Sequence, residues 1–456
     1  MTREEEIADL RRRLADKERE NQALRQELEK LRKEIEEWKR GFRERGKRRC
    51  SKAEGKPKGS GKRPGRKAGH QGASRPVPDR IDRTQEHPAS HVCECGGATE
   101  ETDEVESTVV QDIPPVKVEN VKHVAPVRRC RRCNRRVVAK LPGAVSSGES
   151  VAKVQLGPNA LALAVGLRFQ QKVPLGGIAS FLHTWFDLNI SRGGLSHLFA
   201  RWRVRSQQSY REIEAHVRSA AVAGADETGI RQNGASGYAW LVRTEKASLF
   251  RIELSRGDWV IVAMLGQDFT GVLCTDFYVV YTSHDDWSHG YCGAHNIREA
   301  KKIAEVSPCA ATEAFRDRLC AIYRAGKEAQ QSGDPKARHG VRVRMGQLVA
   351  DATLGTHPDV ARLQARIHEH FHGVLTFVDR PDVPADNNGS ERDIRPFAVY
   401  RKVTGGTRSP EGSETLAHWM SVIQTLGKND IALRPFILAL YQAHHEARPP
   451  PSVFSN

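Results

Sequence analysis

The chain lacks any long apolar run. None of its 456 residues lies in a stretch that approaches the roughly 20 consecutive apolar residues of a membrane-spanning helix. The first residues, MTREEEIADL, lack the apolar segment of a signal peptide. With a mean hydropathy of −0.57, these absences exclude the membrane and secreted classes and predict a cytoplasmic protein. In that compartment the nine cysteines are expected as thiols or metal ligands, not as disulfides.

Acidic residues are in deficit, since 56 Asp and Glu face 72 Lys and Arg, a net charge of +16. Most of the excess lies between Lys39 and Lys67, where 14 basic residues and two acids give +12. Residues 40–85 are rich in Gly, Pro, Lys and Arg, which predicts a flexible basic arm. A basic block indicates a polyanionic partner, and in the cytoplasm that means nucleic acid. A merely solubilising tail is the alternative.

Residues 4–39 carry the heptad pattern of a coiled coil within the segment 1–39. No Gly or Pro interrupts the pattern, and eight of its ten seam positions are apolar. The seam positions are Ile7, Leu10, Leu14, Lys17, Asn21, Leu24, Leu28, Leu31, Ile35 and Trp38. A single amphipathic surface helix is the alternative, and five heptads exceed the usual length of one.

Charges beside this seam favour a parallel, in-register pair of helices, and therefore a homodimer or a higher homo-oligomer. In a parallel pair each g residue faces the e residue five positions on in its partner. All five such pairs are opposite in sign: Glu6 with Arg11, Arg13 with Glu18, Glu20 with Arg25, Glu27 with Arg32, and Glu34 with Lys39. The amide of Asn21, at an a position, is satisfied by its twin only in a parallel, in-register pair.

Two close cysteine pairs predict a zinc-binding module over residues 86–140. The pairs lie in HVCECGG and RRCRRCNRR, and their members are Cys93, Cys95, Cys130 and Cys133. Four thiolates from two chain segments can complete the tetrahedral shell of Zn²⁺. His91 is an alternative to one of the first two sulfurs, and four free structural thiols are the alternative to a metal site. Arg131 and Arg132, beside the second pair, indicate that it faces phosphates.

Residues 150–217 have helical periodicity. The runs GPNALALAVGLRFQ, PLGGIASFLHTWF and SRGGLSHLFARWRVRSQQSYREIEAHV are separated by Gly and Pro, and Ser191 is a suitable helix start. Helix, short turn and helix in succession fit a helix-turn-helix, so this segment is predicted to be a helical DNA-binding domain. A plain helical bundle is the alternative.

The hydrophobic pattern changes to that of an α/β domain over residues 218–309 and 376–415. The predicted elements are strand, strand, strand, helix and strand, in AAVAGADETG, YAWLVRTE, SLFRIELS, RGDWVIVAML and GVLCTDFY. This is the beginning of a ribonuclease-H-like sheet, in which the first and fourth strands lie side by side. The first strand is predicted to end at Asp226 and the fourth at Asp276, which would bring these two carboxylates together.

Carboxylates at the ends of buried strands are costly unless a cation binds them, and a divalent metal does that well. Two metal ions about 4 Å apart stabilise both the attacking and the leaving oxygen of phosphoryl transfer. Such a site uses a third carboxylate from a following helix, and Glu391 in PADNNGSERDIRPF is the candidate. Asn387, Asn388 and Ser390 are helix-starting residues, and Pro396 is predicted to end this helix two turns later.

Other charged residues surround the predicted triad. Asp386 and Asp393 are the alternatives to Glu391 as the third carboxylate. Arg256, Arg392 and Arg395 are predicted to hold DNA phosphates near the metals. Surface ion pairing is the alternative for each arginine.

The 115 positions between the second aspartate and Glu391 are many for a bare fold of this kind. Residues 310–375 are predicted to be a helical insertion that grips DNA or a second subunit, and 416–456 a C-terminal helical segment. Cys292 and His295, in CGAH, lie at a predicted strand-to-helix junction. Two ligands alone make a poor zinc site, so a structural or DNA-orienting role is expected for them.

At these residues the chain resembles the bacterial insertion-sequence transposases of the sixty-six type, which have a DDE catalytic domain. The likeness rests on ADETG at 225–229, SRG at 255–257, GVLCTDFYVVY at 271–281, NNGSERDIRP at 387–396 and RKVTGGTRSPEGSE at 401–414. It extends to the N-terminal zipper, the GRKAGHQG arm and the cysteine module. The resemblance implies that Asp226, Asp276 and Glu391 are a catalytic triad that binds two Mg²⁺ or Mn²⁺ ions, beside a structural Zn²⁺.

The resemblance also implies a bacterial, nucleoid-associated enzyme. Such an enzyme binds double-stranded DNA at the inverted repeats of its element, cleaves there, and joins the freed 3′-hydroxyl to target DNA. Accessory transposition proteins are a partner class that the sequence leaves open. The alternatives are an inactive relative that acts as a repressor, and a ribonuclease-H-like nuclease without strand transfer. The presence of all three acids favours activity, and the zipper, arm and zinc module favour the binding of paired ends.

Overall fold

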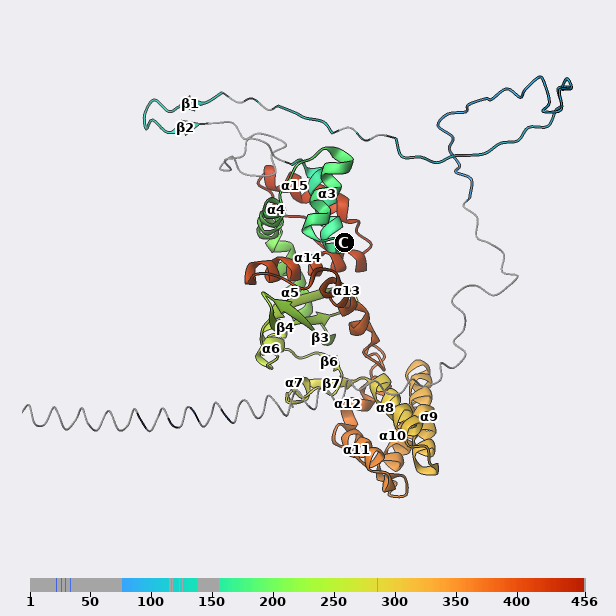
Figure 1. The fold of residues 1–456 in the computed structure, drawn as a ribbon. Helices are drawn as coiled ribbons and strands as arrows, with labels where there is room; N and C mark the ends of the chain where they lie inside the picture. The colour runs from blue at the N-terminus through green and yellow to red at the C-terminus, as the bar shows by residue number, and fades with distance from the viewer. Residues whose placement is uncertain are drawn as a thin grey trace, which may run out of the picture. The chain divides into compact units, whose positions relative to one another are not determined.

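A computed structural model describes residues 76–137, except 115, 117, 123 and 125, and residues 156–454, except 285. It also describes Gln22, Gln26, Glu29 and Lys33. The chain divides into two compact units, Met1–Asp112 and Ile113–Asn456. Figure 1 shows the elements of the second unit, which carries all the named strands and helices described below.

The predicted coiled-coil seam and most of the basic arm lie outside the described residues. The four described residues of residues 4–39 are all helical and exposed. In the predicted heptads they occupy b and f positions, the outermost ones, and such positions face solvent in a coiled coil. Dimerisation through this segment therefore stays a prediction.

A five-stranded mixed sheet forms the centre of the second unit. Its strands are β3 (Val222–Gln232), β4 (Ala235–Arg243), β5 (Ser248–Glu253), β6 (Val272–Thr275) and β7 (Ser288–Tyr291). They lie in the order β5-β4-β3-β6-β7, with β3, β4 and β5 antiparallel and β6 and β7 parallel to β3. The mixed α/β class and the predicted adjacency of the first and fourth strands are confirmed.

The first strand is longer than its pattern predicts. It does not end at Asp226 but continues to Gln232, where the two-residue turn Asn233-Gly234, with both φ angles positive, leads into β4. The reason is that β3 has two different partners. Its parallel pairing with β6 ends at Gly224, whereas its antiparallel pairing with β4 continues to Gln232 and keeps the backbone extended.

The helices before the sheet lie in the segment 150–217, which was predicted to be helical. They are α2 (Pro158–Val165), the π-helical turn η1 (Gly166–Gln170), α3 (Leu175–Phe186), α4 (Arg192–Arg205) and α5 (Gln207–Arg218). The predicted start at Ser191 is confirmed, because its hydroxyl accepts a hydrogen bond from the Gly194 N–H at 3.0 Å. Within the sheet region, α6 (Trp259–Leu265) joins β5 to β6, and the short α7 (Val279–Thr282) precedes β7.

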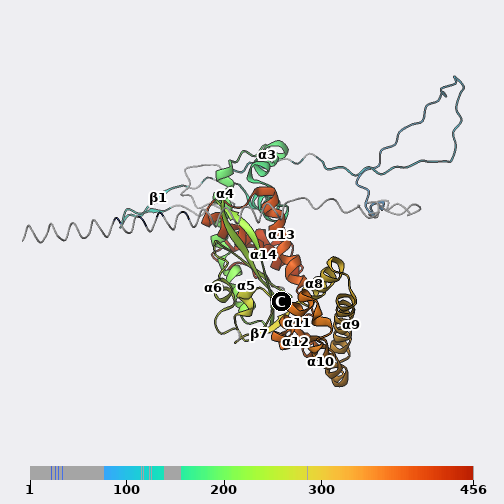
Figure 2. The same cartoon turned by 60° about the horizontal axis from the view of Figure 1, so that its bottom comes forward.

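The segment between β7 and Glu391 is mainly helical. Its elements are α8 (Gly293–Val306), α9 (Ala310–Ser332), α10 (Pro335–Ala350), the 3₁₀ turn η2 (Leu354–Thr356), α11 (Pro358–Glu369) and α12 (Phe371–Asp379). Figures 1 and 2 both show these helices gathered beside the β7 edge of the sheet, and α12 contacts β7 directly. The predicted boundary between residues 375 and 376 falls inside α12.

The helix that carries Glu391 is longer than predicted. It is α13 (Asn388–Thr404), and it continues past Pro396 for two further turns. Proline lacks an N–H, so the carbonyl of Arg392 loses its helical partner at this point. The helix nevertheless continues because Phe397 and Tyr400, beyond the proline, are buried at 0% and 1% exposure and α13 packs against β3 and β4. Tertiary packing therefore overrides the local break.

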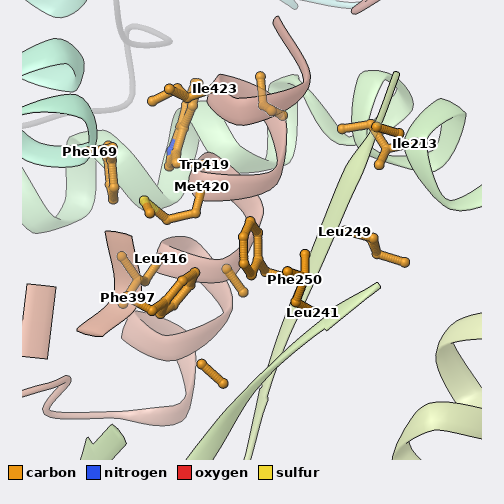
Figure 3. Packing of buried hydrophobic residues seen from close by; sticks show 14 of the residues in the cluster. Phe169, Ile213, Leu241, Leu249, Phe250, Phe397, Leu416, Trp419, Met420 and Ile423 are labelled. Carbon is orange, nitrogen blue, oxygen red and sulfur yellow. The ribbon is translucent and has the colours of Figure 1, made fainter. Parts of the chain in front are cut away.

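Two helices complete the chain, α14 (Pro410–Lys428) and α15 (Leu433–His445). The predicted boundary at residue 415 lies inside α14, which packs against β5. Figure 3 shows Leu416, Trp419 and Met420 of α14 beside Phe397 of α13 and Phe250 of β5. The Phe250 and Phe397 rings lie 4.7 Å apart, and full burial of each such side chain contributes roughly 1.5–3 kcal/mol.

The sheet has a hydrophobic core on each side. Because successive side chains of a strand point to opposite faces, Leu273 of β6 joins the core beneath α14. Its neighbours Val272 and Cys274 join a second core with the helices from α8 to α12. The inserted helices are thus packed on the same face of the sheet as Val272 and Cys274. No helix in the described parts of the chain is long and apolar enough to span a bilayer.

Candidate active site

The register of the sheet brings Asp226 and Asp276 to the same level. The pairs Val222↔Val272, Ala223↔Leu273 and Gly224↔Cys274 keep a constant offset between β3 and β6. Asp226 and Asp276 have the same offset, and they lie two residues beyond the last paired positions. Because side chains alternate along a strand, Asp226 shares the face of Gly224, and Asp276 continues the series of Val272 and Cys274.

Glu391 stands in the first turn of α13, whose start is tied directly to β3. The buried Asn387 side chain donates a hydrogen bond to the Ala225 carbonyl at 2.8 Å and accepts one from the Ser390 hydroxyl at 2.6 Å. Ala225 is the neighbour of Asp226, so this contact fixes the beginning of α13 beside the two aspartates. Sequence reasoning identified Asn387 only as a helix start and missed this role.

Gly224 allows α13 to approach the sheet. A Cβ atom at this position would lie 2.5 Å from the Ser390 hydroxyl and 3.1 Å from the Asn387 side-chain oxygen. Any other residue would therefore push the helix start away from the strand. The glycine two residues before Asp226 was a visible sequence signal, but only the tertiary contact gives it a meaning.

Cys292 holds the same helix start from the other side. Its buried thiol accepts a hydrogen bond from the Asn387 N–H at 3.0 Å, and the Gly293 N–H donates to the Ala385 carbonyl at 3.0 Å. Burial raises the pKa of the Cys292 thiol. Cys292 follows β7 and precedes α8, as the predicted strand-to-helix junction requires. These contacts fit the structural role expected for this cysteine.

Among the three candidate acids, Asp226 has a strongly raised pKa. Burial, and then the negative charges of Glu227, Asp276 and Glu391, raise the pKa of Asp226 to about 7. A hydrogen bond from the Glu227 N–H at 2.9 Å offsets part of this effect. Carboxylates that repel one another in a half-buried position are the donor set that a hard divalent cation prefers.

The Glu391 carboxylate is engaged by two basic side chains of α8. It pairs with Arg298 at 2.5 Å, and the Nε2 atom of His295 lies 3.8 Å away. This hydrogen bond to Glu391 raises the pKa of Arg298. Burial and the charge of Arg298 lower the pKa of His295, while Asp276 and Glu391 partly oppose them. Sequence reasoning missed Arg298, and it noted His295 without connecting it to the triad.

In the described part of the chain, no three His, Cys, Asp or Glu side chains already converge as a metal-ligand group. The donor chemistry of Asp226, Asp276 and Glu391 fits Mg²⁺ or Mn²⁺. Convergence would require Glu391 to exchange its Arg298 partner for the cation.

The alternative third carboxylates are engaged elsewhere. Asp393 accepts from Arg243 at 2.8 Å and from Lys428 at 2.6 Å, in a largely buried network that joins α13 to β4 and α14. Asp386 accepts a hydrogen bond from the Asn388 N–H at 3.2 Å and pairs with Lys327 at 3.5 Å. Both therefore stabilise the position of α13.

The arginines that the sequence assigns to DNA differ in their surroundings. Arg256 follows β5 and pairs with Glu227 at 2.5 Å, and its guanidinium lies 3.9 Å from the centre of the Tyr278 ring. Glu227 also accepts from the Tyr281 hydroxyl at 2.5 Å. Arg392 and Arg395 are exposed on α13, one helical turn apart. Arg256 is thus a positioned cation, and the other two are solvent-facing ones.

The cysteine pairs lie in separate turns, one in each unit. In the first turn, the Cys93 N–H donates to the Gly97 carbonyl at 2.8 Å. In the second, β1 (Arg128–Arg129) and β2 (Arg136–Val137) form a hairpin whose turn contains the exposed Arg131 and Arg132. There the Cys130 N–H donates to the Arg135 carbonyl at 2.9 Å.

Backbone N–H groups face the first sulfur of each cysteine turn. Backbone hydrogen bonds from Cys95 and Cys133 are the largest influences that lower the pKa values of Cys93 and Cys130, respectively. Such bonds favour thiolates, the form that binds zinc. The zinc module stays a prediction, because its two halves belong to different units.

Comparison with known proteins gives the family. A profile described as "Transposase IS66 family" matches residues 153–415, more than half of the chain. The chain belongs to the IS66 family of transposases. The matched residues include Asp226, Asp276 and Glu391, and they extend from the helices before the sheet into α14. The family supports a transposase-type function and confirms the resemblance to the sixty-six type.

A curated relative of this IS66-family transposase is an uncharacterized protein, y4jO, of Sinorhizobium fredii (strain NBRC 101917 / NGR234). It is 30% identical over 145 residues, which are 31% of this chain and 44% of the relative. The chain thus spans less than half the length of that relative, and the relative's name assigns no activity.

Proposed function

We propose that this IS66-family protein is a DDE transposase that binds the inverted-repeat ends of its element and catalyses metal-dependent strand cleavage and strand transfer. The observation that carries the proposal is the common register level of Asp226 and Asp276 on two adjacent parallel strands, with Glu391 on a helix anchored to the Ala225 carbonyl. The strand order β5-β4-β3-β6-β7 supports a ribonuclease-H-like catalytic domain, since it places the first and fourth strands, β3 and β6, side by side as predicted for that fold.

Each acidic residue has a separate part in this proposal. Asp226 and Asp276 would hold the cations, and Glu391 would complete the site from the neighbouring helix. Two bound divalent cations supply charge stabilisation at the attacking and leaving oxygens of phosphoryl transfer. Asn387 positions Glu391 relative to β3, and the ion pair with Arg298 holds the Glu391 carboxylate beside α8.

The cationic side chains would hold the DNA phosphates. Arg256, fixed between Glu227 and the Tyr278 ring, is suited to orient one phosphate near Asp276. Arg392 and Arg395 on α13 would contact the backbone of the bound DNA end. Arg131 and Arg132 would do so from the hairpin of the cysteine module.

Strand cleavage and joining on DNA that carries the element's ends, with and without Mg²⁺, tests the proposal. Mg²⁺-dependent cleavage followed by joining of the 3′ end to target DNA would support it. Cleavage without joining would instead support a ribonuclease-H-like nuclease. Specific binding without cleavage would support an inactive relative that acts as a repressor. Accessory transposition proteins can be added to the same assay.

A structural zinc ion leads to a separate prediction. The purified protein is expected to contain about one tightly held zinc per chain, within the segment that contains Cys93, Cys95, Cys130 and Cys133. Cys130→Ser should release this zinc, as measured by elemental analysis, and weaken DNA binding. Cys309→Ser, at an exposed cysteine outside the module, is the matched control. Metal-free protein that binds DNA with unchanged affinity would rule the module out.

Dimerisation through residues 4–39 also leads to a direct test. Asn21→Cys chains are expected to crosslink to one another at position 21, because a parallel, in-register pair places the two a positions together. Joining of two DNA ends needs two catalytic domains, so this dimer has a functional consequence. Asn21→Leu should bind more tightly but lose its preference for two strands, as measured by sedimentation. Crosslinks only between position 21 and a distant position would show antiparallel helices.

A further inference from the structure

A cavity of about 680 Å³ lies next to Asp276, between the residues that follow β6 and the inserted helices α8 and α11. Its lining contains five cations and three carboxylates. The cations are Arg256, Arg298, Lys302, Arg362 and Arg366, and the carboxylates are Asp276, Glu299 and Asp359. The lining thus has a formal net charge of +2 with His295 neutral, and it is a polar cavity that favours an anionic ligand.

The inner cations are held in fixed positions. Arg366 pairs with Glu299 at 2.7 Å and donates to the Asn296 side-chain oxygen at 2.9 Å. Its guanidinium also lies 4.5 Å from the centre of the Phe277 ring, immediately after Asp276. A guanidinium fixed by a carboxylate and an aromatic face presents its remaining donors without further ordering, as a phosphate-binding arginine does.

The outer cations are accessible to a ligand. The Arg362 side chain is 68% exposed, and it pairs with Asp359 at 3.0 Å and with Glu299 at 3.9 Å. Lys302 is exposed one turn after Arg298 on α8, and in the described parts of the chain it forms no ion pair. The cations therefore form a series from the exposed rim to Arg298, which itself touches Glu391.

The size of the cavity limits the ligand. A space of about 680 Å³ is roughly 9 Å across if taken as a cube, and it falls in the usual range of small-molecule sites. A B-form duplex is wider than its own major groove of roughly 12 Å, and it is therefore wider than this cavity. A few nucleotides of one strand fit such a space, and a double helix does not.

We infer that this cavity binds a short unpaired stretch of DNA strand next to the phosphate that is cleaved. The inference rests on the proposed function, because it names the part of the DNA substrate that lies beside Asp276. Phosphates of the strand would contact Lys302 and Arg362 at the rim and Arg298 within. A phosphate that takes Glu391's place at Arg298 would free that carboxylate to face the two aspartates, so strand binding and completion of the triad are linked.

Photo-crosslinking of the full-length protein tests this inference. The probes are 30-base-pair duplexes in which one strand carries an unpaired four-thymidine tail at its 5′ or its 3′ end. 4-Thiothymidine is placed either in the tail or in the paired part. Omission of Mg²⁺ and Mn²⁺ prevents cleavage and leaves any structural zinc in place. The double variant Lys302→Ala/Arg362→Ala removes two cations of the rim. Its matched control, Lys301→Ala/Arg344→Ala, removes two exposed cations of α8 and α10 that do not line the cavity.

Tail crosslinks are expected in peptides of α8 or α11. The rim variant should reduce their yield about tenfold, while the control changes it less than twofold. The slope of log K against log[salt] is to be measured for tailed and for blunt DNA, and the difference between the two slopes is the contribution of the tail. In the rim variant this contribution should become shallower by about 1.4, the value for two lost single-strand phosphate contacts. Equal yields in both variants, or crosslinks from the paired part only, would overturn the inference.

A parallel Mg²⁺ cleavage assay on the unsubstituted protein separates the two hypotheses. Cleavage together with equal crosslinking in both variants would refute strand binding in the cavity and leave the proposed function intact. Absence of cleavage would refute the proposed function, and with it the link between strand binding and Glu391.

Discussion

Asp226→Asn, Asp276→Asn and Glu391→Gln are each expected to lower strand cleavage on the order of 10³-fold or more. Each amide keeps the shape of the side chain but removes a negative charge that holds a divalent cation. Loss of several kcal/mol of transition-state stabilisation corresponds to a rate loss of this size. Because the phosphate contacts come from arginines, DNA affinity should change little, and cleavage and binding are to be measured on the same end-containing duplex.

The matched control is Asp268→Asn, which removes an exposed carboxylate from the loop between α6 and β6. It should cleave like the unsubstituted protein. Full cleavage by Glu391→Gln would show that Glu391 is not the third carboxylate. Asp386 and Asp393 would then be tested, although their contacts with Lys327, Arg243 and Lys428 make them parts of the scaffold.

Asp226→Asn is also expected to stabilise the metal-free protein at neutral and higher pH. In the folded state the pKa of Asp226 is raised from 3.8 to about 7, mainly by burial. Between these values the folded protein binds a proton that the unfolded chain has lost, so stability falls as pH rises from about 4 to about 7. Asn cannot ionise, and the variant should gain roughly 2–4 kcal/mol at pH 8 and nothing at pH 4.

Thermal unfolding in EDTA at pH 4, 6 and 8 measures this effect, and Asp268→Asn should follow the unsubstituted protein throughout. Added Mg²⁺ should raise the melting temperature of the unsubstituted protein at pH 8 and have a smaller effect on Asp226→Asn, because the variant lacks one ligand. A variant less stable than the unsubstituted protein at pH 8 in EDTA would contradict the strained environment assigned to Asp226.

Local patterns in the sequence predict much of the sheet. Alternating and buried apolar runs identify the first strands, and the order of strands and helices predicts that β3 and β6 are neighbours. The candidate triad follows from acids placed at or after buried strands and at a helix start. These features depend on residues near one another in the chain, and for that reason they can be found without a structure.

The ends of elements depended on distant partners. β3 continues past Asp226 because β4 pairs with it, and α13 continues past Pro396 because Phe397 and Tyr400 are buried. Local rules predict a break at a proline, since the lost hydrogen bond is a local cost. They do not include the larger gain from burying two aromatic rings against a sheet.

What the sequence by itself determined is the family likeness, the helical and sheet regions and the identity of three candidate acids. Only the tertiary structure decided how they are held. The start of α13 meets β3 at Gly224 and the β7–α8 junction at Cys292, and Asn387 makes the hydrogen bonds to both. Arg298 forms an ion pair with Glu391. These residues are separated by up to 163 positions from Gly224 to Asn387, and no local pattern relates them. Their proximity is a product of packing, in which a strand, a junction and a helix must fit together before any of the contacts exists.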